Sequence, residues 1–332
     1  MKHKVLITDY QWTDIEIEKE VLAQADAEPV VATTGEEAEF IELAADADAI
    51  LTCWKNVTAA VLDNAPKCLM VSRYGVGVDN IDVDHASKLG MLVTKVPDYC
   101  MEEVSDHAMA LLLSSARRVA FFSKMTSSGE WDLKKGKPIP RLRGQTLGLL
   151  GYGHIGRTIA PKAIGFGMKV ITYDPVLEPG PLGDSITAVA DMETVLRESD
   201  YISIHLPLIE STRGLMNAKA FDLMKPTAFL INTSRGPVVD EKDLEKALKE
   251  GKIAGAALDV MVEEPPPSDH PLLSLPNFIA TPHVAFYSEA SIEELQRKAA
   301  GNVVQVLRGE VPEHVVNREV IEQDNYRLAA KQ

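Results

Sequence analysis

A glycine-rich turn between an apolar strand and a helical segment constrains the fold of this chain most strongly. The motif GYGHIG at residues 151–156 follows the apolar run Leu147–Leu150, and apolar residues at helical spacing follow it. A strand, a GxGxxG turn and a helix in this order are typical of the dinucleotide-binding corner of an α/β fold. Gly151 permits a tight turn, Gly153 lets the backbone approach a pyrophosphate, and Gly156 allows the helix to pack closely on the strand. The start of the helix then offers N–H groups to the phosphates.

An acidic residue ends the next predicted strand and selects between the two common dinucleotides. Asp174 follows the run Met168–Tyr173. A carboxylate at this point accepts hydrogen bonds from ribose hydroxyls and repels a 2′-phosphate, so NAD is predicted and NADP is disfavoured. The alternative interpretation is an ordinary glycine-rich turn followed by a surface aspartate. The order of strand, glycines, helix, second strand and acid favours the cofactor site.

Short β-like runs alternate with helical segments along most of the chain, which predicts parallel sheets covered by helices on both faces. In the first hundred residues the predicted strands are Val5–Thr8, Pro29–Thr33, Ala49–Cys53, Cys68–Arg73 and Met91–Val96. Further along the chain they are Thr146–Leu150, Lys169–Tyr173, Tyr201–Leu206, Ala228–Thr233, Gly255–Val260 and Phe278–Thr281. We therefore predict an α/β protein with two doubly wound parallel-sheet domains, the second of the Rossmann type.

Long helical segments flank the second series of strands. A helix is predicted from about Met101 to Lys124, and the polar, proline-containing stretch Thr126–Arg143 is predicted to be a loop. The last helix, Ser288–Arg308, is amphipathic, and at that point in the chain it can return to the first domain.

Composition and charge exclude several classes of partner. The chain has 332 residues, enough for two domains, and it contains no apolar run of 18 residues that would span a membrane. Its formal net charge of −15 repels nucleic-acid phosphates and anionic lipid, so neither is expected as a partner. Cys53, Cys68 and Cys100 have no CxxC spacing, which suits a reducing cytoplasm and predicts no metal site.

Three residues with catalytic chemistry follow the last predicted strands. Arg235 follows Ala228–Thr233, Glu264 follows the strand that ends near Asp259, and His283 follows Phe278–Thr281. Ligands of open α/β sheets bind outside the carboxyl ends of the strands, so these side chains are expected to converge at the cofactor. Reduction of a 2-keto acid needs a guanidinium to grip the carboxylate, an imidazole to donate a proton and a carboxylate to orient the imidazole.

Each of the three residues also has a structural interpretation. Arg235 alone is a surface charge in a loop, His283 alone is a polar residue at a strand end, and Glu264 alone belongs to a solvated turn. Their joint occurrence at strand ends, after a complete cofactor motif, favours the catalytic interpretation. His107 is interpreted as structural, and His205 with Leu206 and Pro207 is expected to line the cofactor pocket.

With these motifs in order, the sequence resembles the D-isomer-specific 2-hydroxyacid dehydrogenases. The stretches 147–156 and 231–240 resemble the two signatures of that family, and Ala256–Val260 and Thr281–His283 resemble two further motifs. The resemblance implies a Rossmann NAD-binding domain, residues 101–289, inserted into a flavodoxin-like substrate domain, residues 1–100 and 290–332. It also implies a homodimer formed through the helix that begins near Met101.

The resemblance also implies roles for individual residues. Arg235, Glu264 and His283 would form the catalytic triad, and backbone N–H groups of Val76 and Gly77 would bind the substrate carboxylate. The expected substrate contacts are completed by Tyr74, Tyr99 and Phe286. The expected cofactor contacts are Gly151, Gly153, His154, Ile155, Gly156, Asp174, Pro175, His205, Leu206, Pro207, Thr212, Thr233, Ser234, Arg235, Asp259 and His283.

Within the family, the segment Phe286–Glu293 resembles most the C-terminal binding protein-like branch, which consists of NAD(H)-binding corepressors. That branch has Trp where Phe286 stands. The predicted function is hydride transfer between NAD(H) and C2 of a small 2-keto or D-2-hydroxy acid. The alternatives are an NAD(H)-sensing regulator with little turnover, and a relative acting on formate or phosphite. Glyoxylate, hydroxypyruvate, pyruvate, phosphohydroxypyruvate and bulkier keto acids all stay open as substrates.

Overall fold

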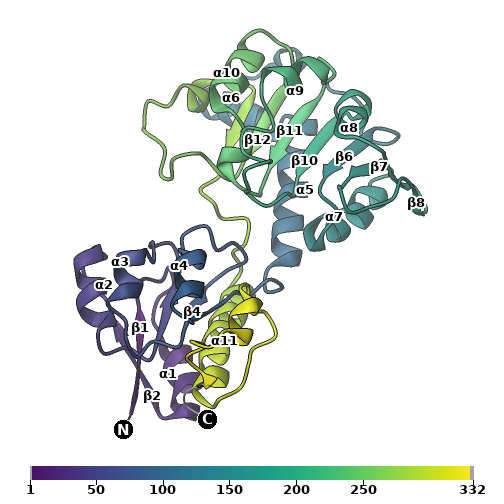
Figure 1. Cartoon of the computed structure of the whole chain (residues 1–332). Coiled ribbons are helices and arrows are strands. Elements are labelled where there is room, and N and C mark those ends of the chain that lie inside the picture. The colour runs from purple at the N-terminus through teal and green to yellow at the C-terminus, as the bar shows by residue number, and fades with distance from the viewer. Residues whose placement is uncertain (1, 330–332) are drawn as a thin grey trace. The chain divides into compact units, whose positions relative to one another are not determined.

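The computed structural model describes residues 2–329, and the chain forms two compact units, each with its own sheet (Figure 1). Unit 1 comprises residues 1–100 and 288–332, and unit 2 comprises residues 101–287. Each sheet is assembled almost entirely from parallel strands joined by helices. The predicted α/β class with two doubly wound sheets is therefore confirmed.

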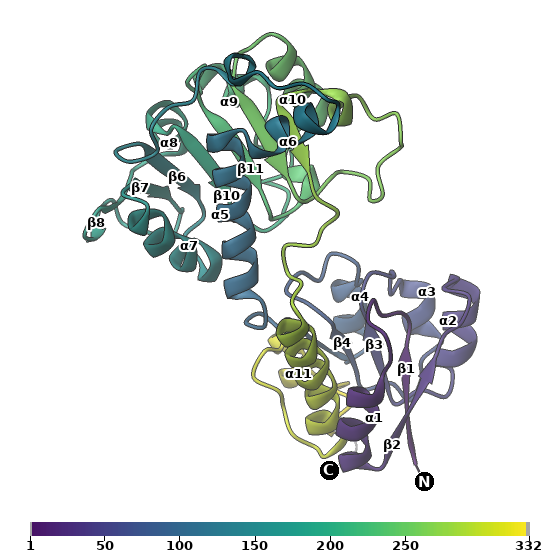
Figure 2. The same ribbon diagram turned by 180° about the vertical axis from the view of Figure 1, so that it is seen from behind.

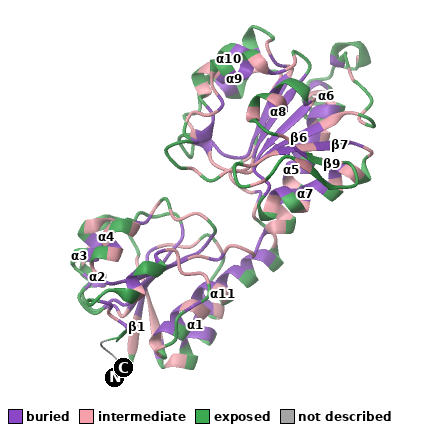
Figure 3. Ribbon diagram, turned by 45° about the vertical axis from the view of Figure 1, so that its right-hand side comes forward, coloured by how far each residue is buried: buried purple, intermediate pink, exposed green. Residues whose placement is uncertain are grey.

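The sheet of unit 1 has five parallel strands in the order β2-β1-β3-β4-β5, which is the flavodoxin-like order. The strands are β1 His3–Ile7, β2 Ala27–Val31, β3 Ala49–Thr52, β4 Met70–Arg73 and β5 Leu92–Thr94. Because both faces are covered, the central strands β3 and β4 are buried at every position (Figure 3).

Helices cover the two faces of this sheet separately. One face packs against α2 Glu37–Ala44, α3 Ala59–Asp63 and α4 Val83–Lys88, whose apolar side chains include Phe40 and Leu62. The other face is covered by α1 Glu16–Leu22 and α11 Glu289–Leu307, which lie side by side (Figures 1 and 2). Thus the C-terminal helix belongs to the same core as the first hundred residues.

Unit 2 contains an eight-stranded sheet in the order β13-β12-β11-β10-β6-β7-β9-β8, in which only β8 is antiparallel to its neighbour. The strands are β6 Thr146–Leu150, β7 Lys169–Tyr173, β8 Gly180–Gly183, β9 Ile186–Ala188, β10 Tyr201–Ile204, β11 Phe229–Asn232, β12 Gly255–Leu258 and β13 Phe278–Ala280. The chain reverses its direction of travel across the sheet between β6 and β10. That switch point is where doubly wound sheets bind dinucleotides.

Two separate apolar cores cover the faces of this sheet. On one face lie α5 Met101–Arg117 and α7 His154–Gly165, and α6 Val119–Ser127 continues from α5. On the other lie α8 Met192–Glu198, α9 Ala218–Leu223 and α10 Glu241–Lys249. The N-cap side chains Asp191, Asn217 and Asp240 accept hydrogen bonds from first-turn N–H groups and start these last three helices.

Three local predictions were wrong. The helix expected over residues 101–124 is broken at Arg118, whose φ of 54° is left-handed, and the second helix then extends into the expected loop. That loop also contains a 3-10 turn, Leu133–Gly136. The strands β8 and β9 were not predicted, because β8 is rich in glycine and β9 has only three residues, so neither carries a clear apolar pattern.

Among residues 2–329, no helix combines the length and apolar character needed to cross a membrane. Within the same residues, no group of three or more His, Cys, Asp or Glu side chains is arranged to hold a metal ion.

A buried carboxyl group joins two helices of unit 1. Glu18 in α1 has no exposed surface, and its carboxyl accepts hydrogen bonds from Nε2 of Gln296 in α11 (2.9 Å) and from the hydroxyl of Tyr74 (3.1 Å). Burial raises the pKa of Glu18 above its ordinary value of 4.5, and the hydrogen bonds oppose this shift only in part. The ionised form is therefore less favourable in the folded chain than in the unfolded chain.

This shift predicts that Glu18→Gln stabilises unit 1 at neutral pH. As pH rises above 4.5, the unfolded chain loses the Glu18 proton first, so the wild-type protein loses stability until the folded group also ionises. We expect the glutamine variant to melt roughly 2–4 °C higher at pH 7.5, the shift that about 1 kcal/mol produces in a domain of this size. The difference in melting temperature between the two proteins, measured by circular dichroism, should become smaller towards pH 4. Glu20→Gln, on the exposed side of α1, is the control, and equal differences at both pH values would contradict the argument.

Candidate functional site

The three predicted catalytic residues lie in loops that leave one edge of the unit 2 sheet. Arg235 follows β11, Glu264 follows β12 and His283 follows β13. These strands are parallel neighbours, and Asn232, Leu258 and Ala280 are aligned across them at their carboxyl ends. Because of this register, the three loops begin at the same level of the sheet, as the sequence predicted.

A short hydrogen bond joins the imidazole and the carboxylate. Nδ1 of His283 lies 2.6 Å from Oε2 of Glu264, and the other oxygen, Oε1, accepts the backbone N–H of Met261 at 2.8 Å. A carboxylate only accepts hydrogen bonds, so the shared proton belongs to Nδ1 of the ring. The pairing fixes both the tautomer and the orientation of the imidazole.

The backbone at His283 has a conformation that few residues adopt. Its φ of 50° lies in the left-handed region, which costs about 1–3 kcal/mol for a side chain other than glycine. The His283 N–H donates to the carbonyl oxygens of Asp259 (2.8 Å) and Thr281 (3.0 Å). Strain of this kind, held by surrounding hydrogen bonds, is typical of functional sites.

Asp259 supports the turn that carries His283. Its side chain is 1 % exposed and accepts hydrogen bonds from the backbone N–H groups of Val284 (3.0 Å) and Ala285 (2.9 Å) and from the Thr281 hydroxyl (2.5 Å). Burial raises the pKa of Asp259, but the nearby His107 ring and the hydrogen bonds from Thr281 and the two amides outweigh it, and the net pKa is lowered. Asp259 is thus an ionised acceptor turned into the protein.

Arg235 is held against the loop that carries Glu264. Its Nη1 donates to the carbonyl of Ser234 at 2.8 Å, and its own carbonyl accepts Nδ2 of Asn232 at 2.9 Å. A Cβ on the next residue, Gly236, would lie 2.0 Å from the carbonyl oxygen of Met261. Only glycine permits this backbone contact, which brings the Arg235 loop and the Glu264 loop together.

The glycine-rich turn has the geometry that dinucleotide phosphates require. Gly151 has a φ of 96°, and a Cβ there would lie 2.7 Å from the carbonyl oxygen of His205. A Cβ on Gly156 would lie 2.5 Å from the carbonyl oxygen of Gly151, so only glycine lets α7 approach β6 this closely. A Cβ on Gly153 would meet no atom within 4 Å, so this side of the turn is open. No side chain caps the start of α7 at His154 and Ile155, and these features together fit a pyrophosphate.

Two further residues agree with a dinucleotide at this edge. Asp174, after β7, accepts the backbone N–H of Tyr152 within the glycine-rich turn at 2.9 Å and that of Val176 at 3.2 Å. Pro175 lies between Asp174 and Val176. Thr233, after β11, has a buried hydroxyl without a hydrogen-bond partner among the described residues. A buried polar atom of this kind is usually satisfied by a ligand or water.

The segment after β10 also borders the glycine-rich turn. Burial lowers the pKa of His205 to about 4, so its ring is neutral near pH 7, and its Nε2 lies 2.9 Å from the Ser203 hydroxyl. Leu206 follows, with its side chain close to the position that a Gly151 Cβ would take. The hydroxyl of Thr212 donates to the carbonyl of Pro207 at 2.6 Å, which ties this loop together.

The residues expected to contact substrate divide between the two units. Tyr74 and Tyr99 are buried in unit 1, and the Tyr74 hydroxyl donates to Glu18. Val76, by contrast, is exposed, and Gly77 is half-buried. In unit 2, the ring of Phe286 meets that of His283 edge-on, with centroids 6.3 Å apart.

Sequence reasoning overlooked two residues at this site. His107, interpreted as structural, reaches Thr281 beside His283, and Met261 supplies the N–H that holds Glu264. His107 and Thr281 are 174 positions apart, and a backbone N–H carries no residue-type signal, so neither contact was visible in a local pattern.

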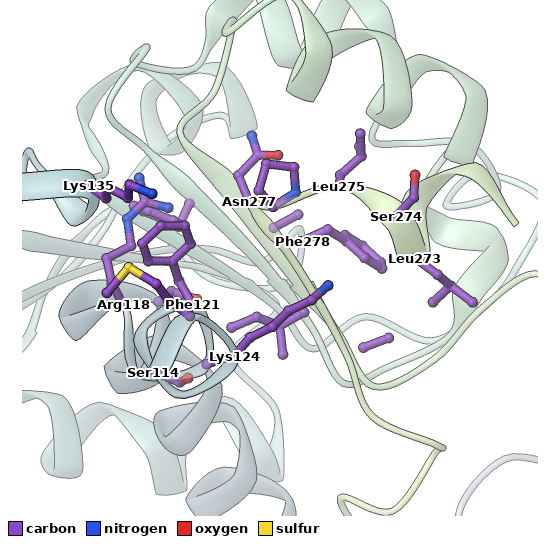
Figure 4. Close-up of a pocket in the computed structure, with 18 of the residues that line it drawn as sticks. Ser114, Arg118, Phe121, Lys124, Lys135, Leu273, Ser274, Leu275, Asn277 and Phe278 are labelled. Carbon is purple, nitrogen blue, oxygen red and sulfur yellow. The ribbon is translucent and has the colours of Figure 1, made fainter. Parts of the chain in front are cut away.

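A separate cavity of about 550 Å³ lies elsewhere in unit 2 (Figure 4). It is bordered by α5 and α6 on one side and by the segment 273–280 on the other. Arg118, Phe121 and Lys124 line it, whereas Arg235, Glu264 and His283 do not. This cavity is therefore distinct from the candidate catalytic site.

Comparisons with known proteins agree with this geometry. The family model for the D-isomer specific 2-hydroxyacid dehydrogenase, NAD binding domain, matches residues 109–285. The chain is 42% identical over 330 residues to D-3-phosphoglycerate dehydrogenase of Methanocaldococcus jannaschii, covering 97% of this chain but only 60% of that protein. It is 41% identical over 287 residues to glyoxylate reductase of Korarchaeum cryptofilum, covering 85% of this chain and 86% of that protein.

A solved structure supports the same relationship. D-lactate dehydrogenase from Aquifex aeolicus, complexed with NAD and lactic acid, superposes with a TM-score of 0.83 at 28% identity, covering 95% of this chain and 99% of that chain. Taken with the glycine-rich turn and the strand-end residues, these matches establish that the chain belongs to the D-isomer specific 2-hydroxyacid dehydrogenase family.

Proposed function

We propose that the protein is an NAD-dependent oxidoreductase that transfers a hydride between NAD(H) and C2 of a small 2-keto or D-2-hydroxy acid. The observation that carries the proposal is the 2.6 Å hydrogen bond between His283 and Glu264 at the edge where the Arg235 loop also ends. An oriented imidazole at the sheet edge that also carries an arginine suits the reduction of a carbonyl next to a carboxylate.

The three side chains divide the work of the reaction. Glu264 holds the Nδ1 proton of His283, so Nε2 is the ring atom that gives a proton to the C2 oxygen during reduction and takes it back during oxidation. Arg235 binds the substrate carboxylate and orients the carbonyl. Bound NADH supplies the hydride that is added to C2.

Unit 2 would bind the dinucleotide through the glycine-rich turn, with Asp174 at the ribose and Thr233 and Ser234 on the nicotinamide side. The buried Asp259 would act there by supporting the turn that carries His283. Unit 1 would be the substrate domain, in which the backbone N–H groups of Val76 and Gly77 bind the substrate carboxylate. This assignment keeps the domain limits expected from the sequence, 1–100 with 290–332 and 101–289.

The relatives suggest the size of the substrate. Those aligned over most of their length are named glyoxylate reductase, and one solved relative holds lactic acid. We propose 2-keto acids with small groups on C2, of which glyoxylate is the smallest. The regulator alternative requires NADH binding without turnover, which an intact imidazole–carboxylate pair does not favour.

The buried thiols agree with a reducing cytoplasm. Cys53, Cys68 and Cys100 are unbridged and buried, and burial raises the pKa of Cys53 to about 12. A protonated, buried thiol is a poor nucleophile. We therefore propose a cytoplasmic protein in which these cysteines fill the core of unit 1.

We predict that His283→Asn lowers kcat for 2-keto acid reduction by roughly 10²–10⁴-fold, as loss of a general acid does. Asparagine tolerates the left-handed backbone at this position, so the turn is retained. NADH oxidation is followed at 340 nm against a panel of 2-keto acids, and NADH affinity is measured by fluorescence and should change little.

His85→Ala, which removes a histidine paired with Asp63 in unit 1, is the matched control and should turn over normally. Unaltered turnover in His283→Asn would contradict the assigned role. A wild-type protein that binds NADH tightly but reduces no member of the panel would favour the regulator instead.

We also predict a preference for NADH over NADPH that depends on the charge of Asp174. Asp174→Asn keeps an acceptor for the Tyr152 N–H but removes the repulsion of a 2′-phosphate. The ratio of kcat/KM for NADH to that for NADPH should fall by at least about 10-fold, or about 1.4 kcal/mol. Asp184→Asn, in the exposed β8–β9 turn, is the control. A ratio that stays constant in Asp174→Asn would exclude this carboxylate as the selector.

We propose that two copies of the chain associate through α5, the helix that begins at Met101, together with the segment 119–133 that follows it. Three large apolar side chains there are exposed: Val119 (56%), Trp131 (91%) and Leu133 (73%). Exposed apolar side chains of this size are typical of interaction surfaces, and the cavity beside α6, lined in part by Phe121 and Phe278, can receive a side chain of a second copy (Figure 4). A two-fold interface would use this segment from both copies.

Light scattering coupled to size-exclusion chromatography tests this proposal. The wild-type protein should have twice the mass of one 36.3 kDa chain, and the double variant Trp131→Ala/Leu133→Ala should shift towards one chain at micromolar concentration because the buried apolar area is lost. Val176→Ala, which removes another exposed apolar side chain, is the control. A monomeric wild-type protein would overturn the proposal.

A further inference from the structure

A histidine from a different part of the fold reaches the turn that carries His283. His107 lies in α5, near the start of unit 2, and its Nε2 is 2.9 Å from the hydroxyl oxygen of Thr281 and 3.4 Å from Oδ1 of Asp259. The side chain of His107 is 22% exposed, and that of Asp259 is 1% exposed. The contact therefore lies largely out of water, where hydrogen bonds are strong.

The protons of this contact follow from its chemistry. The Asp259 carboxylate is an acceptor, so the single proton of the Thr281 hydroxyl points to it across 2.5 Å. Thr281 must then accept from His107, which requires a proton on Nε2 of that ring. A chain of hydrogen bonds thus runs from His107 through Thr281 to Asp259.

At its other end, this series of hydrogen bonds holds the backbone at His283 and at the two residues that follow it. Asp259 holds the N–H groups of Val284 and Ala285 with its carboxylate, and its backbone carbonyl holds the N–H of His283. Thr281 stands two positions before His283 and accepts from the same N–H through its carbonyl. The left-handed backbone at His283 persists because these hydrogen bonds outweigh its cost.

We propose that His107 is a positioning residue for the reaction: through Thr281 and Asp259 it fixes the turn that aims the His283 imidazole. The inference rests on the proposed function for its kinetic consequence, but the contact itself is independent of it. His107 does not touch substrate in this account. Its loss would let the turn relax from its strained conformation, and a misplacement of about 1 Å at a reacting group costs up to about 10²-fold in rate.

Four single variants separate a donated hydrogen bond from simple packing. His107→Ala and Thr281→Val remove the donor and the hydroxyl, and each should lower kcat at least about 10-fold with the NADH dissociation constant within about 2-fold of wild type. His107→Gln places an amide N–H near the position of Nε2, and Thr281→Ser keeps the hydroxyl, so both should remain within about 3-fold of wild-type kcat.

The double variant His107→Ala/Thr281→Val tests whether the two residues act along one path. If they do, the kcat of the double variant should equal that of the slower single variant to within about 2-fold. Losses of kcat that multiply in the double variant would contradict the proposal. A His107→Gln variant as slow as His107→Ala would also contradict it, because packing alone would then explain the effect. If His107→Ala does not fold, Thr281→Val against Thr281→Ser decides the same question.

A second measurement does not require turnover. The imidazole signals of the protein are recorded by long-range ¹H–¹⁵N NMR, and that of His283 is assigned from its absence in His283→Asn. We expect this signal to shift or broaden in His107→Ala and to return in His107→Gln. An unchanged His283 signal would overturn the positioning role even in an active enzyme. A wild-type protein without activity but with the expected spectra would instead contradict the proposed function.

Discussion

The hydrogen bond between His283 and Glu264 is the interaction on which the interpretation of this protein depends. It joins loops from two neighbouring strands and sets which ring nitrogen carries the fixed proton. Backbone groups contact both members of the pair directly. Glu264 is held by the N–H of Met261, and His283 is held by the carbonyl oxygens of Thr281 and Asp259. The candidate catalytic groups are therefore an extension of the sheet, which is a rigid scaffold.

Close backbone contacts at glycine assemble the two halves of the site. Gly236 brings the Arg235 loop against Met261, and Gly156 brings the start of α7 against the glycine-rich turn. In both places a Cβ would overlap a carbonyl oxygen, so the contact depends on the missing side chain. One contact lies beside the candidate catalytic groups and the other lies in the turn proposed to bind the phosphates, and both lie at the carboxyl edge of one sheet.

Much of this arrangement was predictable from local sequence patterns. The glycine-rich turn, Asp174 and the order of strand-end residues identify the fold and the candidate site because they combine periodicity with chemistry within short segments. The break at Arg118 was not predictable, since a left-handed residue other than glycine leaves no signal in an apolar pattern. The strands β8 and β9 were missed because glycine and proline dominate β8. The support of His283 by His107 depends on tertiary contacts between segments far apart in the chain.

The account is tested most directly by a crystal structure of the protein with NAD⁺ and oxamate, an unreactive analogue of a 2-keto acid. We predict that Nε2 of His283 lies within about 2.6–3.2 Å of the analogue's carbonyl oxygen, with the Arg235 guanidinium on its carboxylate and C2 facing the nicotinamide. An analogue bound away from His283, or an imidazole turned from Glu264 towards solvent in the complex, would contradict the assignment.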